Sequence, residues 1–376
     1  MLKAFKYRAY PNKKKALLMD KNIHSARFMY NKLLEEKIVY YKTNKEMLYN
    51  TPAMYKGEHH WLREVDSLAL ANAQLHVETA FKNFFRDKKI GFPNFKSRHK
   101  TKWSYTTNVV GSNIKVENGK IRLPKVGWVK IKYHRNMIGK LKSVTITKTR
   151  SGKYYVSCLC EYEADVEPVK PETFIGLDFS MPHLYIDSNG DEPEYPQFYR
   201  KSEEKLVREM RKLSLMEKGS SNRNKQRIKV ARLMEHIANQ RKDFLHKLST
   251  EIANRYDCVG IESLDMKAMS QALNFGKSVH DNGWGMFTTF LEYKLAERGK
   301  FLIKIDKWFP STKACSECGS VKPMPLNERM YVCPECGSVL PRDVNAAINI
   351  CNEAKRTVGH TGIARTTTAG AYNAAP

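Results

Sequence analysis

The chain has 376 residues, of which 41% are hydrophobic, and it carries a formal net charge of +26 with an isoelectric point near 9.6. This hydrophobic content excludes an intrinsically disordered protein, and the length favours two or three domains. The sequence contains no run of 18 apolar residues and no apolar signal region near Met1. We therefore expect a soluble, cytoplasmic protein that has no membrane partner.

The positive charge indicates a polyanionic partner. Between Arg200 and Lys247 there are 15 Lys and Arg residues against 6 Asp and Glu. A solvated helix face would give the same pattern, and an anionic membrane would attract it, but no basic amphipathic terminal segment or lipidation motif is present. Nucleic acid is the favoured partner, and its binding would be steeply salt-dependent because phosphate neutralisation dominates it.

The first part of the chain predicts a β-rich domain with a helical insertion. Leu2–Tyr10 alternates like a strand, and residues 13 to about 97 show helical spacing of apolar residues. Short strands separated by glycine turns follow at Trp103–Thr107, Ile121–Leu123, Val129–Tyr133, Lys142–Thr147 and Tyr154–Tyr162. We expect a small β-barrel whose first strand comes from the N-terminus.

The second part predicts alternating strands and helices after a linker at 163–172, which contains two prolines. Strands are expected at 173–179, 183–187, 195–199, 258–262 and 301–306, and the first three resemble the meander of an RNase H-like domain. A basic helical stretch, 201–256, is expected to break at Gly219–Asn222, and a further helix at 284–299. Within 201–256, one helix face is expected to pack against the core through Ile237, Leu245, Leu248 and Ile252. The tail from Thr357 to Pro376 is predicted to be disordered.

Four of the eight cysteines have metal-ligand spacing. Cys315 and Cys318 form one pair and Cys333 and Cys336 another, with 14 residues between the pairs, as in four-cysteine zinc ribbons. A redox dithiol would not need two matched pairs, so a structural Zn²⁺ site is favoured. The other cysteines lie within apolar segments, and Cys158 and Cys160 share a strand face with Tyr154, Val156 and Tyr162. A reducing compartment is implied.

Three carboxylates are the candidate catalytic residues. Asp178 lies within an apolar strand, Glu262 ends another, and Asp343 opens a helix. A charge in a buried strand is costly unless it is paired or binds metal, so three converging carboxylates would bind two Mg²⁺ ions roughly 3.5–4 Å apart and cut a phosphodiester. Each residue also has an ordinary explanation: Asp178 at a solvated strand end, Glu262 opening a loop, Asp343 as a helix N-cap.

These residues and their neighbours carry a resemblance to the TnpB (OrfB) family of insertion-sequence-encoded RNA-guided DNA nucleases, relatives of the type V CRISPR effectors. The resemblance covers nearly the whole chain. Its carriers are Ala80–Phe85, Ser104–Thr107, Ile175–Ser180, Gly260–Leu264, Lys307–Ser311, the four ribbon cysteines and Arg342–Ala347. The order of these motifs, with the ribbon before the third carboxylate, makes the resemblance specific.

The resemblance implies a multidomain fold. It comprises a wedge β-barrel (1–12 and 98–170), a helical recognition domain (13–97), a split RuvC nuclease domain (171–310 and 341–356), an inserted zinc ribbon that binds target nucleic acid (311–340) and a tail (357–376). Asp178, Glu262 and Asp343 would be the Mg²⁺-binding triad. A guide RNA from the element's own end would direct cleavage of double-stranded DNA beside a short motif, and pairing would supply the sequence specificity.

Asn72, Tyr105 and Thr106 are candidates for reading that motif. Packing for Tyr105 and a solvated or helix-internal position for Asn72 are equally compatible with the sequence. The family often has an acidic residue where this chain has Pro341. Proline suits the first turn of a helix and Asp343 itself is present, so we expect activity to persist. A nucleoid-associated bacterial or archaeal protein is expected, with a monomer favoured.

The leading hypothesis for the mechanism is Mg²⁺-dependent hydrolysis that leaves a 3′-hydroxyl and a 5′-phosphate. One ion, held chiefly by Asp178 and Asp343, would activate water, and the other, held by Asp178 and Glu262, would stabilise the leaving oxygen. Two alternatives stay open: strand transfer by a transposase with the same site, and a guide-directed DNA-binding regulator or RNA-processing factor that does not cut.

Overall fold

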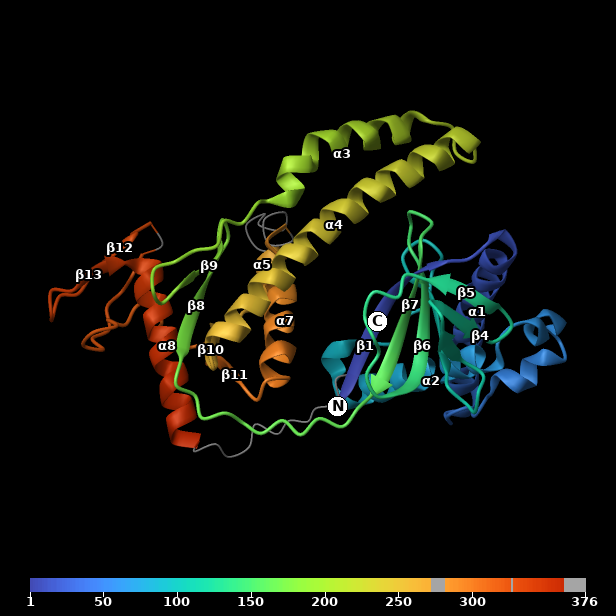
Figure 1. The fold of residues 1–376 in the computed structure, drawn as a ribbon, viewed down its shortest axis with the longest axis horizontal. Helices are drawn as coiled ribbons and strands as arrows, with labels where there is room; N and C mark the ends of the chain where they lie inside the picture. The colour runs from blue at the N-terminus through green and yellow to red at the C-terminus, as the bar shows by residue number, and fades with distance from the viewer. Residues whose placement is uncertain (272–280, 326, 362–376) are drawn as a thin grey trace. The chain divides into compact units, whose positions relative to one another are not determined.

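The computed structural model describes residues 1–271, 281–325 and 327–361. The chain divides into two compact units, one formed by Met1–Ala164 and the other beginning at Asp165 (Figure 1). Among the described residues, none of the helices combines the length and the apolar character needed to cross a membrane.

A seven-stranded antiparallel sheet forms the centre of the first unit. Its strands, in chain order, are β1 (Leu2–Tyr10), β2 (Trp103–Asn108), β3 (Lys115–Glu117), β4 (Lys120–Leu123), β5 (Gly127–Ile131), β6 (Lys140–Lys148) and β7 (Tyr154–Glu161). The order across the sheet is β2-β6-β7-β1-β5-β4-β3. The N-terminal strand therefore lies inside this sheet, as predicted. Closure of the sheet into a barrel stays a prediction.

Alternation along β7 supplies part of the core of this sheet. Tyr154, Val156, Cys158 and Cys160 are all buried, because alternate side chains of a strand face the same side. Burial raises the pKa of the Cys158 thiol to about 12, as expected for a small core residue. The prediction of core cysteines is confirmed, although Tyr162 lies beyond the end of the strand and is half-buried.

Two long helices follow β1 in the sequence. Helix α1 (Lys13–Asn44) begins after Asn12, whose side chain accepts a hydrogen bond from the backbone N–H of Lys15 at 2.9 Å. Helix α2 (Ser67–Arg86) begins after the N-cap Asp66. Short 3₁₀ turns lie at Pro52–Lys56, His60–Glu64 and Lys88–Ile90. The two helices enclose their own apolar cluster, so the predicted helical insertion is confirmed.

The second unit contains a four-stranded sheet with the order β11-β10-β8-β9. The strands are β8 (Phe174–Ser180), β9 (Leu184–Asp187), β10 (Cys258–Glu262) and β11 (Phe301–Ile305), and a separate hairpin is formed by β12 (Met330–Val332) and β13 (Val339–Pro341). Strands β8, β10 and β11 are parallel, whereas β9 is antiparallel to β8. The carboxyl ends of the three parallel strands therefore meet at one edge of the sheet.

Helices lie between these strands in the sequence, and a long helix follows the last strand. They are α3 (Phe198–Leu215), α4 (Ser221–Arg255), α5 (Met266–Gln271), α7 (Trp284–Ala296) and α8 (Arg342–Thr361). The predicted break at Gly219–Asn222 is confirmed, because Ser220 caps α4 by accepting from the backbone N–H of Arg223 at 3.1 Å. The predicted packing stripe of α4 is also confirmed: Ile237, Leu245 and Ile252 are buried, and Leu248 packs against the core of this unit.

The predicted strand at 195–199 is wrong. Residues 191–197 have no regular structure, and α3 begins at Phe198. Pro193 and Pro196 lack the backbone N–H that a sheet ladder requires, which explains the missing strand. The apolar character of the segment instead comes from Tyr195, which packs into the core of this unit.

Helix α8 continues to Thr361, past Thr357, the residue at which the tail was predicted to begin. Thr357 donates a hydrogen bond from its hydroxyl to the carbonyl of Glu353 at 2.8 Å, in the manner of a residue inside a helix. The rest of the predicted disordered tail, 362–376, lies outside the described residues.

Candidate active site and metal-binding ribbon

The three predicted carboxylates lie at the carboxyl edge of the four-stranded sheet. Strand pairing places Leu177 opposite Ile261, so Asp178 and Glu262 follow at the same level of adjacent parallel strands. Asp343 is the second residue of α8, which packs against both β8 and β10. Residues that are far apart in the sequence are thus brought together by one sheet and one helix.

The carboxylates interact electrostatically. Asp178 is only 7% exposed, and its pKa lies well above the usual value, chiefly because of burial and then because of the negative charges of Glu262 and Asp343. Arg342 opposes this shift. Two further negative charges beside a buried carboxylate are unfavourable on their own and would be offset by a bound cation, and carboxylate oxygens are the ligands that Mg²⁺ prefers.

Two side chains contact this cluster directly. The Ser311 hydroxyl donates a hydrogen bond to Oε1 of Glu262. The guanidinium of Arg342 donates from Nε to Oδ1 of Asp343 at 2.9 Å and forms an ion pair with it through Nη2, also at 2.9 Å. Sequence reasoning missed both roles. Ser311 and Arg342 belong to motifs quoted above, but their spacing alone does not say where their side chains point.

Pro341 lies just outside the helix. It ends β13 and pairs with Met330 on β12, and α8 begins at the next residue, Arg342. The expectation that Pro341 occupies the first helical turn is therefore wrong. A proline is tolerated at this place because the two-stranded hairpin leaves it at a strand end.

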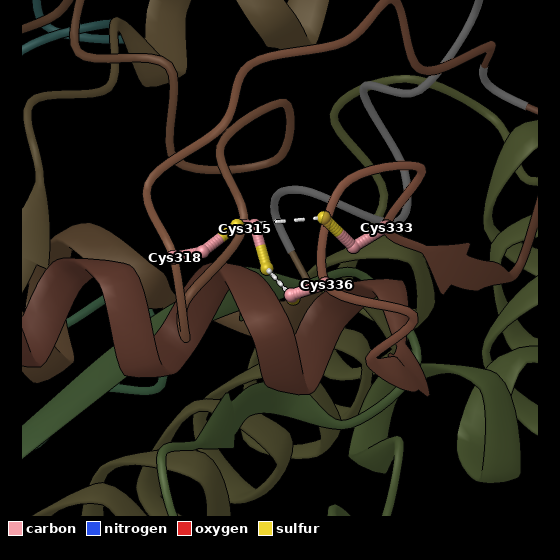
Figure 2. Close-up of side chains that lie close together, drawn as sticks. All are labelled: Cys315, Cys318, Cys333 and Cys336. Carbon is pink, nitrogen blue, oxygen red and sulfur yellow. Dashed lines mark hydrogen bonds between the residues drawn. The ribbon is translucent and has the colours of Figure 1, made fainter.

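The four ribbon cysteines form a cluster (Figure 2). Their Sγ atoms all lie within 4.8 Å of one another, with 3.7 Å between Cys315 and Cys336 and 3.5 Å between Cys318 and Cys333. A tetrahedral Zn²⁺ with Zn–S bonds near 2.3 Å would separate its sulfurs by about 3.8 Å. The donor set and spacing fit such an ion, and four thiolates leave no ligand position open for catalysis.

Each cysteine pair lies in a tight turn that ends with a glycine. Gly319 and Gly337 adopt positive φ angles of 76° and 72°. Their backbone N–H groups donate to the carbonyls of Cys315 at 2.9 Å and Cys333 at 3.1 Å. Positive φ is accessible to glycine without steric cost, so these residues allow each turn to close around its pair of sulfurs.

The three candidates for DNA-motif reading lie in the first unit. Asn72, on α2, is 7% exposed and donates from Nδ2 to the carbonyl of Leu68 in its own helix at 2.8 Å. Tyr105, on β2, is 3% exposed and belongs to the core of the sheet. The hydroxyls of Thr106 and Thr145 hydrogen-bond across β2 and β6 at 2.9 Å. A role in DNA reading stays a prediction for all three.

Family models match most of the chain in three segments. Residues 157–273 match a model described as "Probable transposase", and residues 284–350 match "Cas12f1-like, TNB domain". Residues 1–46 match "Helix-turn-helix domain". In the structure this last segment consists of β1 and the single helix α1, with no turn between two helices.

Several curated relatives carry the name "Putative RNA-guided DNA endonuclease", and two of them match most of this chain. One, from Streptomyces pristinaespiralis, is 35% identical over 338 residues, which cover 87% of this chain and 83% of the relative. The other, InsQ from Escherichia coli (strain K12), is 31% identical over 342 residues, which cover 85% of this chain and 83% of the relative.

A solved structure shares the fold. The protein in the Cas12f1–sgRNA–target DNA complex aligns with a TM-score of 0.56 at 13% identity. The alignment covers 94% of this chain and 99% of the solved one.

Proposed function

This chain belongs to the TnpB (OrfB) family of RNA-guided DNA nucleases, and we propose that it cuts double-stranded DNA beside a short adjacent motif, directed by a guide RNA. The names of its curated relatives and its net charge of +26 support a nucleic-acid partner. The observation that carries the proposal is the placement of Asp178, Glu262 and Asp343 at one edge of the sheet, which follows from the pairing of β8 with β10 and the packing of α8 against both strands.

In this proposal Asp178, Glu262 and Asp343 hold two Mg²⁺ ions. When bound, these ions supply positive charge to the attacking and leaving oxygens of a phosphodiester. Asp178 is held rigidly within β8, whose neighbours β9 and β10 pair with it on both sides. Ser311 restricts the orientation of Glu262, and Arg342 compensates the charge of Asp343. The protein thereby orients three ligands on rigid elements.

We extend the proposal to the rest of the chain. Residues 171–310 and 341–356 would form the nuclease domain, and 311–340 a zinc ribbon that contacts target DNA. Residues 13–97 would recognise nucleic acid together with the sheet of the first unit. The basic helices α3 and α4 offer positive charge for a phosphate backbone, which is the kind of contact that an RNA-guided protein needs when base pairing supplies specificity.

The experiment is a cleavage assay with a matched control. The protein is co-expressed with the DNA that flanks its gene, so that any guide is made, and is tested with Mg²⁺ on a guide-matched plasmid with a randomised flank. Asp178→Ala removes the buried carboxylate, and Asp243→Ala removes an exposed one that pairs with Lys247 on α4. Wild type and Asp243→Ala should cut and share a flank motif, while Asp178→Ala should bind guide RNA without cutting.

The DNA products of this assay distinguish the proposed function from its alternatives. Cleavage by Asp178→Ala at the wild-type rate would contradict the proposed site. Joined strands in place of linear DNA would indicate strand transfer. Binding of the matched plasmid without cleavage by any variant would indicate a targeting protein, with Pro341 as the first residue to replace.

A further inference from the structure

We propose that the metal ribbon positions the nuclease carboxylate Glu262 through the loop Ser311–Ser316, which two asparagines of α8 fasten to the helix that carries Asp343. The inference rests on the proposed function, because it concerns the same metal-binding carboxylates. Ser311, Asn345 and Asn349 are then positioning residues, and the ribbon supports the nuclease site in addition to any contact with nucleic acid.

The first link joins the loop to Glu262. The Ser311 hydroxyl donates to Oε1 of Glu262, and Ser311 is only 4% exposed. Glu262 is the last residue of β10, so its backbone is fixed by the sheet while its side chain extends beyond the strand end. A buried hydroxyl that donates to one carboxylate oxygen restricts the rotation of that side chain and leaves the other oxygen oriented toward a ligand.

The second link joins the loop to α8. Asn349 donates from Nδ2 to the carbonyls of Ser311 at 2.8 Å and Ala314 at 2.7 Å. Asn345 donates from Nδ2 to the carbonyl of Ala314 at 2.8 Å, and its Oδ1 accepts from the backbone N–H of Ser316 at 2.9 Å. Both asparagines are buried, at 6% and 0% exposure. Breaking these bonds would leave buried carbonyl groups unsatisfied, which is costly.

The third link joins the loop to the ribbon metal site. Cys315 lies between Ala314 and Ser316, the two residues that Asn345 holds. A metal bound by Cys315 therefore restrains the same backbone segment that supplies the Ser311 hydroxyl. Figure 2 shows the cysteine cluster lying over α8, which carries Asp343 two residues before Asn345. The loop and the helix together set the position of Glu262 relative to Asp343.

The test separates this positioning from folding and from catalysis. In the full-length protein, Ser311→Ala removes the hydroxyl and Ser311→Thr restores one. Ser316→Ala is the matched control, since the Ser316 hydroxyl is buried in the same loop and has no hydrogen-bond partner among the described residues. For each variant we would measure zinc content, thermal stability, Mn²⁺ affinity by calorimetry and the Mg²⁺ concentration for half-maximal cleavage.

We expect Ser311→Ala to retain zinc and to bind Mn²⁺ about 10–100-fold more weakly, with a matching rise in the Mg²⁺ requirement. Ser311→Thr and Ser316→Ala should resemble wild type. Asn349→Ala should weaken Mn²⁺ binding in the same way, and it provides the test if Ser311→Ala does not fold. Wild-type Mn²⁺ affinity in these variants would overturn the inference.

A substitution of Glu262 distinguishes failure of this inference from failure of the proposed function. Glu262→Ala should weaken Mn²⁺ binding if the proposed metal site exists. If Glu262→Ala weakens it and Ser311→Ala and Asn349→Ala do not, positioning by the loop is wrong and the proposed function stands. If Glu262→Ala also leaves Mn²⁺ affinity unchanged, the proposed metal site is wrong and the inference falls with it.

Discussion

Gly176 on β8 and Ala347 on α8 lie in direct backbone contact. A Cβ atom on Gly176 would lie 2.0 Å from the carbonyl oxygen of Ala347 and 2.6 Å from the backbone nitrogen of Cys351. A Cβ on Gly260 of β10 would likewise lie 2.8 Å from the carbonyl oxygen of Ile350. The two glycines let α8 pack closely onto the strands that carry Asp178 and Glu262, and this packing brings Asp343 to the same edge.

Gly176→Ala should therefore destabilise the second unit strongly. The new methyl group meets backbone atoms, which cannot move aside as a side chain can, so we expect a loss of about 3 kcal/mol or more in the free energy of unfolding. Gly285→Ala on α7 is the matched control, because nothing lies within 4 Å of its Cβ position. There, alanine should leave the free energy of unfolding unchanged or raise it by up to about 1 kcal/mol, because Gly285 lies in the first turn of the helix. Urea unfolding of both variants gives the comparison, and equal stabilities would contradict the close packing.

Asp257→Asn should lower stability in a pH-dependent way. Burial raises the pKa of Asp257, but the Thr173 hydroxyl and the backbone N–H groups of Thr173 and Glu172, together with Lys300, outweigh this and lower it to about 2. A lowered pKa stabilises the fold above the unfolded-state pKa near 4, and this stabilisation is lost as the pH falls through 2.

The stability difference between wild type and Asp257→Asn should accordingly be about 1–2 kcal/mol at pH 7 and should shrink between pH 4 and pH 2. Chemical unfolding at several pH values measures it. Asp243→Asn, at an exposed ion pair with Lys247, should show no such trend. A difference that stays constant down to pH 2 would mean that the charge of Asp257 is not the stabilising feature.

Zinc content should depend on the ribbon cysteines alone. Cys333→Ser removes one of four converging sulfurs and should reduce bound zinc from about one ion per chain to a small fraction, with loss of ribbon structure. Cys158→Ala, in the core of the first unit, should retain the metal. Elemental analysis of both purified variants measures this, and full zinc occupancy in Cys333→Ser would exclude a four-cysteine site.

Tyr105→Phe tests whether a buried hydroxyl has a function. The Tyr105 hydroxyl is buried and has no hydrogen-bond partner among the described residues. Its removal should leave the unfolding free energy unchanged or raise it by up to about 1 kcal/mol, because no bond is lost. Thermal unfolding measures this. If Tyr105 reads the adjacent motif through its hydroxyl, the variant should in addition cut DNA with an altered preference for the flanking sequence.

Local features of this protein could be predicted from its sequence. The cysteine spacing indicated the metal cluster, alternation indicated β7, and helical spacing indicated α4, because each pattern depends on neighbours within a few residues. Asp178, Glu262 and Asp343 were likewise predicted as catalytic candidates from their local sequence, since a carboxylate within an apolar strand needs a partner. The strand expected at 195–199 failed where two prolines outweighed the apolar pattern.

Long-range features were decided by the tertiary structure. The approach of Asp343 to Asp178 depends on α8 packing against two glycines, and the bond from Ser311 to Glu262 joins residues 49 positions apart. Sequence spacing does not determine which side chain turns toward which, because that depends on how the elements pack. Composition and local periodicity thus determined most of the helices and strands and the candidate functional residues. Close packing at two glycines and hydrogen bonds from two asparagines decided which of these residues lie near one another.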